Sequence, residues 1–123
     1  MTAHPNVARR TFKYKLTSTS KTDFFTVGEG NDTDSNDIEL TSIRVVDSTG
    51  AVNASVRLWM TIAGTEYVET YDTPVETNYP RRWFFEGDRL YRGDKITIQG
   101  GNGHHVTISY IPIIASGGEA QQR

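Results

Sequence analysis

The chain has 123 residues, no cysteine and a formal net charge of −2 at neutral pH. This length fits one domain, and the missing cysteines exclude disulfides, thiolate catalysis and cysteine-ligated zinc. A near-neutral balance argues against a nucleic-acid partner, because a phosphate-binding face needs a clear basic excess. The N-terminus has no apolar run, and no segment approaches the roughly 18 apolar residues of a membrane helix, so we expect a soluble protein without a signal peptide or a membrane partner.

The beginning of the chain is basic and the region after it is acidic. Residues 1–21 contain basic residues and no acidic one, whereas residues 22–39 show the reverse pattern. Residues 1–10 have few apolar anchors, which predicts a flexible basic arm. The basic arm is expected either to be attracted to the acidic region of the same fold or to lie on an acidic neighbouring surface, and we favour the second alternative. The basic residues expected to bind a partner are Arg9, Arg10, Lys13 and Lys15.

The first strand signal is residues 11–17, where aromatic and aliphatic residues alternate with lysines. Outward lysines are typical of a sheet edge, where they discourage unwanted pairing. Residues 24–27 form a short apolar strand signal, and the polar run 28–37 predicts a loop.

The middle of the chain holds the clearest alternation. In residues 38–46 the apolar positions shift from even to odd near Thr41, which predicts a β-bulge. A turn at residues 47–50 predicts a hairpin with the next strand, 52–62. Strict alternation in that strand places Leu58 and Ile62 on the buried face.

The second half contains shorter strand signals separated by turn residues. A tight turn at residues 63–65 leads into a strand at 67–71. Two short apolar pieces follow, at 83–85 and 90–91. A final hairpin is predicted between 95–99 and 106–110, across a glycine-rich turn.

About eight short strands with regular turn signals, and no amphipathic helical window, predict an all-β domain. We expect a single antiparallel β-sandwich or jelly roll over residues 11–115, with a small β-barrel as the alternative. Residues 116–123 are expected to form a flexible C-terminal tail.

The sequence predicts no enzyme, metal or cofactor. Asp32 begins a run of alternating oxygen ligands like the first half of a calcium loop, but Ile43 stands where that motif needs a bidentate glutamate. His104 and His105 are adjacent, so on a strand they point to opposite faces and a single monomer rarely directs both at one metal. No spacing of serines or carboxylates indicates a nucleophile or an acid/base pair.

Aromatic residues are the more informative candidates. By alternation, Trp59 falls on the polar face of its strand, so it marks either a second packing surface or an exposed anchor for a partner or a sugar. We include Tyr79 and Trp83 with it as candidate partner-binding residues.

The motifs over residues 38–114 resemble those of small all-β virion proteins of tailed bacteriophages. The features that carry this resemblance are Thr41-Ser42-Ile43-Arg44-Val45, the alternating strand 52–62, Gly64-Thr65-Glu66-Tyr67, the proline-containing crossing 74–83, Leu90-Tyr91-Arg92-Gly93-Asp94-Lys95-Ile96 and the strand 106–110. The resemblance implies a non-enzymatic structural role, as a capsid decoration or cement protein that bridges major coat subunits, or as a neck, tail or fibre component.

The same resemblance implies partners and a location. We expect the major capsid protein or other virion proteins as partners, a homo-oligomer with a trimer favoured, and a place in the virion after assembly in the host cytoplasm. The less favoured alternative from another class is a carbohydrate-binding module that uses exposed Trp59, Trp83 or Tyr79.

Overall fold

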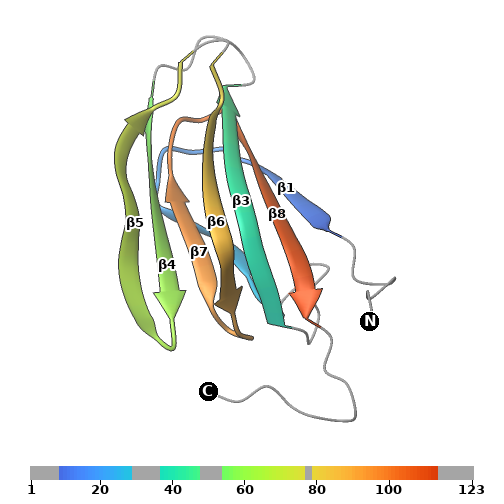
Figure 1. Cartoon of the computed structure of the whole chain (residues 1–123). Helices are drawn as coiled ribbons and strands as arrows, with labels where there is room; N and C mark the ends of the chain where they lie inside the picture. Colours follow the sequence, from blue (N-terminus) through green and yellow to red (C-terminus); the bar gives the residue numbers. More distant parts are fainter. Residues whose placement is uncertain (1–8, 29–36, 48–53, 77–78, 114–123) are drawn as a thin grey trace, which may run out of the picture.

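The computed structural model describes residues 9–28, 37–47, 54–76 and 79–113. These residues form eight β-strands in two four-stranded antiparallel sheets (Figure 1). The strands are β1 (Arg10–Lys15), β2 (Thr22–Thr26), β3 (Asp37–Asp47), β4 (Ser55–Ile62), β5 (Thr65–Pro74), β6 (Arg81–Leu90), β7 (Lys95–Gln99) and β8 (His104–Ile113).

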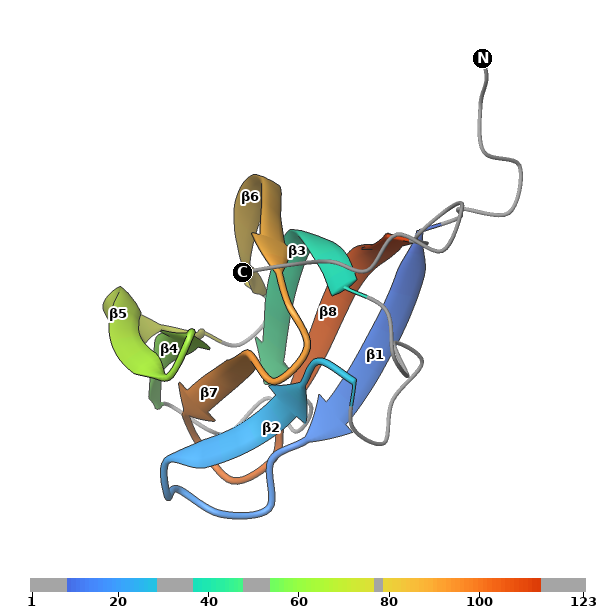
Figure 2. The same ribbon diagram turned by 90° about the horizontal axis from the view of Figure 1, so that it is seen from below.

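The strand order is that of a jelly roll. One sheet has the order β1-β8-β3-β6 and the other β2-β7-β4-β5, so most consecutive strands lie in different sheets. Figure 2 shows β1 and β2 together at one flank of the sandwich, and β5 and β6 at the other. The predicted sandwich is therefore confirmed, whereas the alternative of a closed barrel is wrong.

The core lies between the two sheets and is built from alternate residues of each strand. In β8 the period places Val106, Ile108 and Tyr110 in the core, and in β3 the same period places Ile43 and Val45 there. At the β1–β2 flank, the ring of Phe25 lies 5.2 Å from that of Phe12 and 5.7 Å from that of Tyr110. This cluster joins β1 and β8 of one sheet to β2 of the other.

The face assignment of the long central strand is confirmed. Leu58 is completely buried, and Ile62 packs against the core. The bulge predicted near Thr41 is also present, because the pairing register of β3 shifts between Leu40 and Ser42 against both of its neighbours.

Both hairpins predicted across longer turns are wrong. The strands β3 and β4 lie in different sheets, as do β7 and β8, so neither pair forms a hairpin. The hairpin that forms is β4–β5, across Ala63 and Gly64, both with positive φ. The short piece at 83–85 and Leu90 of the second piece also belong to one strand, β6, which continues through Gly87 at a φ of 74° and ends before Tyr91.

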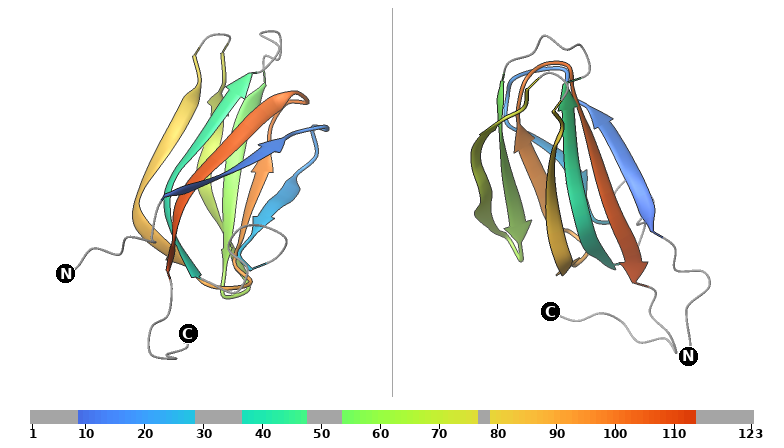
Figure 3. Two further views of the ribbon diagram at one scale, coloured as in Figure 1. Left: turned by 90° about the vertical axis from the view of Figure 1, so that its right-hand side faces the viewer. Right: turned by 45° about the horizontal axis from the view of Figure 1, so that its top comes forward.

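The basic strand at the N-terminus is part of the sandwich. Strand β1 begins at Arg10 and pairs with β8 along its length (Figure 3). Lys13 and Lys15 are therefore held on a sheet edge, as their alternation predicts. Residues 1–8, most of the expected arm, and the expected tail at 116–123 lie outside the described residues.

We expect Leu58→Ala to lower the free energy of unfolding by about 2–5 kcal/mol, because it removes a buried side chain and leaves a cavity. The neighbouring Arg57→Ala should cost less than about 1 kcal/mol, since Arg57 forms an exposed ion pair with Asp72. Denaturant unfolding of both variants measures this difference, and equal losses would contradict the core assignment.

Candidate functional site

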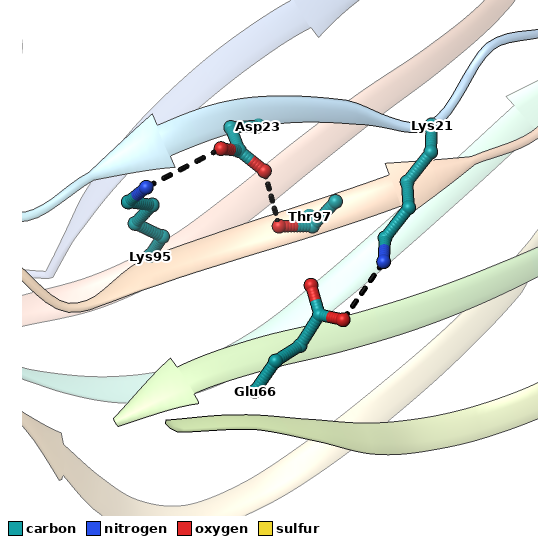
Figure 4. Close-up of polar contacts among 5 residues, drawn as sticks. All are labelled: Lys21, Asp23, Glu66, Lys95 and Thr97. Atoms are coloured by element: carbon teal, nitrogen blue, oxygen red, sulfur yellow. Dashed lines mark hydrogen bonds and ion pairs between the residues drawn. The ribbon is translucent and has the colours of Figure 1, made fainter. Parts of the chain in front are cut away.

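The two outer faces of the sandwich differ in whether their cations form ion pairs with carboxylates. On the β2-β7-β4-β5 sheet, cations are paired with carboxylates. Lys21 Nζ lies 2.8 Å from Glu66 Oε1 and Lys95 Nζ lies 3.5 Å from Asp23 Oδ2 (Figure 4). Arg57 Nε lies 3.0 Å from Asp72 Oδ1. These cations are therefore neutralised by carboxylates of the same chain, and they do not need a charged partner to neutralise them.

Trp59 lies beneath these ion pairs. It occupies the outer face of β4, as alternation predicts, but only 8% of its surface is exposed. Lys21 Nζ lies 4.2 Å from the ring centroid and the Arg57 guanidinium lies 5.9 Å away. The ring therefore packs against the cations Lys21 and Arg57, and little of it is left exposed for a partner.

Asp23 has a local hydrogen bond that stabilises its charge. The buried Thr97 hydroxyl donates to Asp23 Oδ1 at 2.6 Å (Figure 4). This bond lowers the pKa of the Asp23 carboxyl, burial opposes the change, and the charges of Lys95 and Lys21 lower it further.

Part of the β1-β8-β3-β6 sheet has the opposite character, although one ion pair joins Arg89 of β6 to Asp37 of β3 at 3.3 Å. Its pairing register places Lys13, Thr107, Arg44 and Arg82 in one row across the four strands. Among the described residues, none of these three cations forms an ion pair with a carboxylate. The buried Nε of Arg44 also makes no hydrogen bond to another described residue. This row is a cationic surface without a partner inside the described fold, and we call it the basic row.

A surface groove of about 370 Å³ runs over the basic row. Arg9 adds a fourth cation to its lining, and a second groove of about 500 Å³ shares Lys13 and Arg44 with it. Three of the sequence-predicted partner residues, Arg9, Lys13 and Lys15, thus line grooves on one face. Arg10 lies on the same strand, but it is not among the residues that line either groove.

The flank at β5 carries four of the five exposed large hydrophobic side chains among the described residues. Tyr67, Val68 and Tyr71 of β5 are 53%, 45% and 75% exposed, and Tyr79 just after it is 68% exposed. We call these four residues the aromatic flank. Trp83, in contrast, is partly buried and packs against the core. Of the three aromatic candidates from the sequence, Tyr79 alone is strongly exposed.

Glu69, which lies on β5 beside the aromatic flank, has a raised pKa. Burial raises the pKa of its carboxyl, and the nearby charge of Asp88 on β6 raises it further. Its ionised form is therefore disfavoured in the folded protein.

The histidine pair separates as the alternation predicts. His105 is exposed on the basic face, whereas His104 is fully buried and its Nδ1 accepts a hydrogen bond from the Gly101 amide at 3.1 Å. Across the described ranges, no group of three or more His, Cys, Asp or Glu side chains is arranged to hold a metal ion. Nor does any helix in them have the length and apolar character needed to cross a membrane.

Sequence reasoning missed Arg44, Arg82 and Phe84 as members of one surface. Each stands at an outward position of its strand, which is a readable signal. Their proximity depends on the pairing of β6 with β3, and no local pattern contains that information.

Comparison with known proteins supports the fold and no more. No family model matches the sequence, and no curated protein matches it. Among solved structures, it is similar to the nucleoplasmin-like N-terminal domain of Drosophila FKBP39, with a TM-score of 0.51 and 12% sequence identity. That similarity covers 94% of this chain and 99% of the other. At this identity, the similarity concerns the sandwich architecture alone.

Thr97→Val should raise the pKa of the Asp23 carboxyl toward its usual value of 3.8, because the substitution removes the hydroxyl that donates to it. Above pH 3.8 the variant should be less stable than the parent, and this difference should shrink as the pH falls through the lowered pKa of Asp23. NMR titration of the Asp23 side chain measures the shift. An unchanged pKa would show that Lys95 and Lys21 dominate instead.

Glu69→Gln should make the protein more stable at pH 7, because glutamine cannot ionise. A raised folded-state pKa means that ionised Glu69 destabilises the fold at high pH, and that the effect disappears below the ordinary pKa of 4.5. The gain in melting temperature should therefore shrink as the pH falls through the raised pKa and vanish below 4.5. A gain that persists in acid would implicate packing instead of charge.

Proposed function

We propose that this protein is a non-enzymatic structural protein of a tailed-bacteriophage virion. In this proposal it is a capsid decoration or cement protein that binds coat subunits through the aromatic flank. The supporting observation is that four of the strongly exposed large hydrophobic side chains, Tyr67, Val68, Tyr71 and Tyr79, belong to β5 and the short segment after it. Tyr67 and Val68 are adjacent on β5 and point to opposite faces, so this edge strand exposes apolar side chains on both of its sides. Exposed apolar residues of this kind are typical of protein interfaces, and tyrosine is enriched among the energetically important interface residues.

The backbone of β5 supports the same use. This ten-residue strand pairs only with β4 in the described fold, so its outer edge is open, and nearly all of its side chains are exposed. An open edge strand can accept a strand from another chain, which adds main-chain hydrogen bonds to aromatic contacts. Glu66 and Asp72 on this strand are paired with Lys21 and Arg57, so a partner that binds there does not have to cover an unpaired carboxylate at either position.

The virion assignment itself depends on the sequence resemblance described above. That resemblance fits a jelly-roll module, since the same class of fold serves in viral capsid proteins. A neck, tail or fibre component would use the same surface on a different virion partner. We expect a homo-oligomer, with a trimer favoured, and light scattering of the purified protein measures it directly.

The test uses phage capsids that lack this protein and the double variant Tyr67→Ser/Tyr71→Ser. Both side chains are exposed, so we expect unchanged folding and at least a tenfold loss of capsid binding in cosedimentation. Phe84→Ser is the matched control, because Phe84 is as exposed as Tyr71 but lies in the other sheet.

One result would overturn the virion role and another would overturn the docking surface. Absence of binding by the parent protein to capsids and to isolated necks and tails would remove the virion role. Equal binding by the double variant and the parent would retain the role but exclude the aromatic flank as the docking surface.

A further inference from the structure

We propose that the groove over the basic row is a binding site for an acidic saccharide, one that carries carboxylate or sulfate groups. This inference goes beyond the proposed virion role and does not depend on it, because it rests on the outer face of the β1-β8-β3-β6 sheet and not on β5.

Charge is the first reason. Lys13, Arg44 and Arg82 stand in one row without a described carboxylate partner, while the cations Lys21 and Lys95 of the opposite face are paired. Neighbouring strands are about 4.8 Å apart, so the row spans roughly 14 Å across four strands. That width suits a ligand with more than one anionic group, and arginine offers each group a planar fork of donors.

Hydroxyl groups are the second reason, and they favour a sugar over a purely acidic partner. Five hydroxyl side chains line the same groove between the cations, namely Thr11, Thr41, Ser42, Thr107 and Ser109. Thr41 Oγ1 donates to the Ser109 carbonyl at 2.9 Å, and the others make no side-chain hydrogen bond to another described residue. A hydroxyl both donates and accepts, which matches the hydroxyls of a sugar, whereas a carboxylate surface supplies acceptors only.

An exposed aromatic ring is the third reason. Phe84 is 75% exposed and lies in the groove lining beside Ser42, its partner across the β3–β6 pairing. The guanidinium of Arg82 lies 5.8 Å from its ring centroid. A flat ring next to cations and hydroxyls can cover the apolar face of a sugar ring while its acidic group reaches the arginines.

The size of the groove and the overall charge argue against the other polyanions. A volume of about 370 Å³ is at the lower end of the range for small-ligand sites, so it fits a short piece of a chain and not a protein surface. Single-stranded nucleic acid is usually held by several aromatic platforms along a basic channel. Here the described groove holds a single aromatic residue, and the whole chain has a net charge of −2.

Calorimetry with a set of acidic and neutral probes tests the proposal. The probes are trigalacturonate, a heparin-derived tetrasaccharide, neutral trigalactose, an end-blocked triglutamate peptide, the oligonucleotide dT4 and inorganic sulfate. We expect the full-length protein to bind at least one of the two acidic saccharides, and to bind it at least tenfold more tightly than every other probe.

Variants locate the binding. Arg82→Gln and Phe84→Ala change exposed residues, so both should fold, as circular dichroism will check, and each should weaken saccharide binding at least tenfold. Lys95→Gln removes the same charge from the opposite face and should leave the affinity unchanged.

Several results would overturn the inference. They are no binding of either acidic saccharide, equal or tighter binding of triglutamate, dT4 or sulfate, an unchanged affinity in Phe84→Ala, or an equal loss in Lys95→Gln. Equal or tighter binding of triglutamate or dT4 would reassign the groove to an acidic protein segment or to nucleic acid, respectively.

Discussion

The burial of one apolar face from each sheet is the constraint on which the rest of this structure depends. Side chains alternate along a strand, so placing Ile43 and Val45 in the core forces Arg44 outward, and placing Ile108 inward forces Thr107 outward. A shift of one residue in register would reverse both faces at once. The surface rows of this protein are consequently determined by the same packing that holds the two sheets together.

Given that constraint, the two outer surfaces differ in how their charges are compensated. On the β2-β7-β4-β5 face, the cations form ion pairs with Glu66, Asp23 and Asp72. The buried ring of Trp59 lies beneath Lys21 and Arg57. The basic row on the other face leaves its guanidinium and ammonium groups without described acidic partners. Exposed ion pairs add little stability, so the difference matters more for recognition than for folding.

The two flanks are also unlike. Phe12, Phe25 and Tyr110 close the flank at β1 and β2 with packed rings, and both edge strands there are short. At the other flank, β5 and β6 are ten residues long, and β5 exposes tyrosines along an open edge. Natural proteins usually protect such edges, so a long exposed one is a reason to look for a partner there.

The sequence by itself determined the all-β class, most strand positions, the buried face of β4 and the bulge in β3, because each is encoded in local alternation or in a break of it. It also placed Trp59 and the charged residues of β1 on outward faces. It misassigned the connections before β4 and β8 as hairpins, since turn residues such as Gly100 to Gly103 suit a crossing between sheets as well as a hairpin. Only the tertiary structure decided which strands are neighbours, and pairing depends on contacts far apart in the chain. That pairing brought Lys13, Arg44 and Arg82 into one row and covered Trp59 with Lys21, so the charge and exposure of the candidate surfaces could not be read from any local pattern.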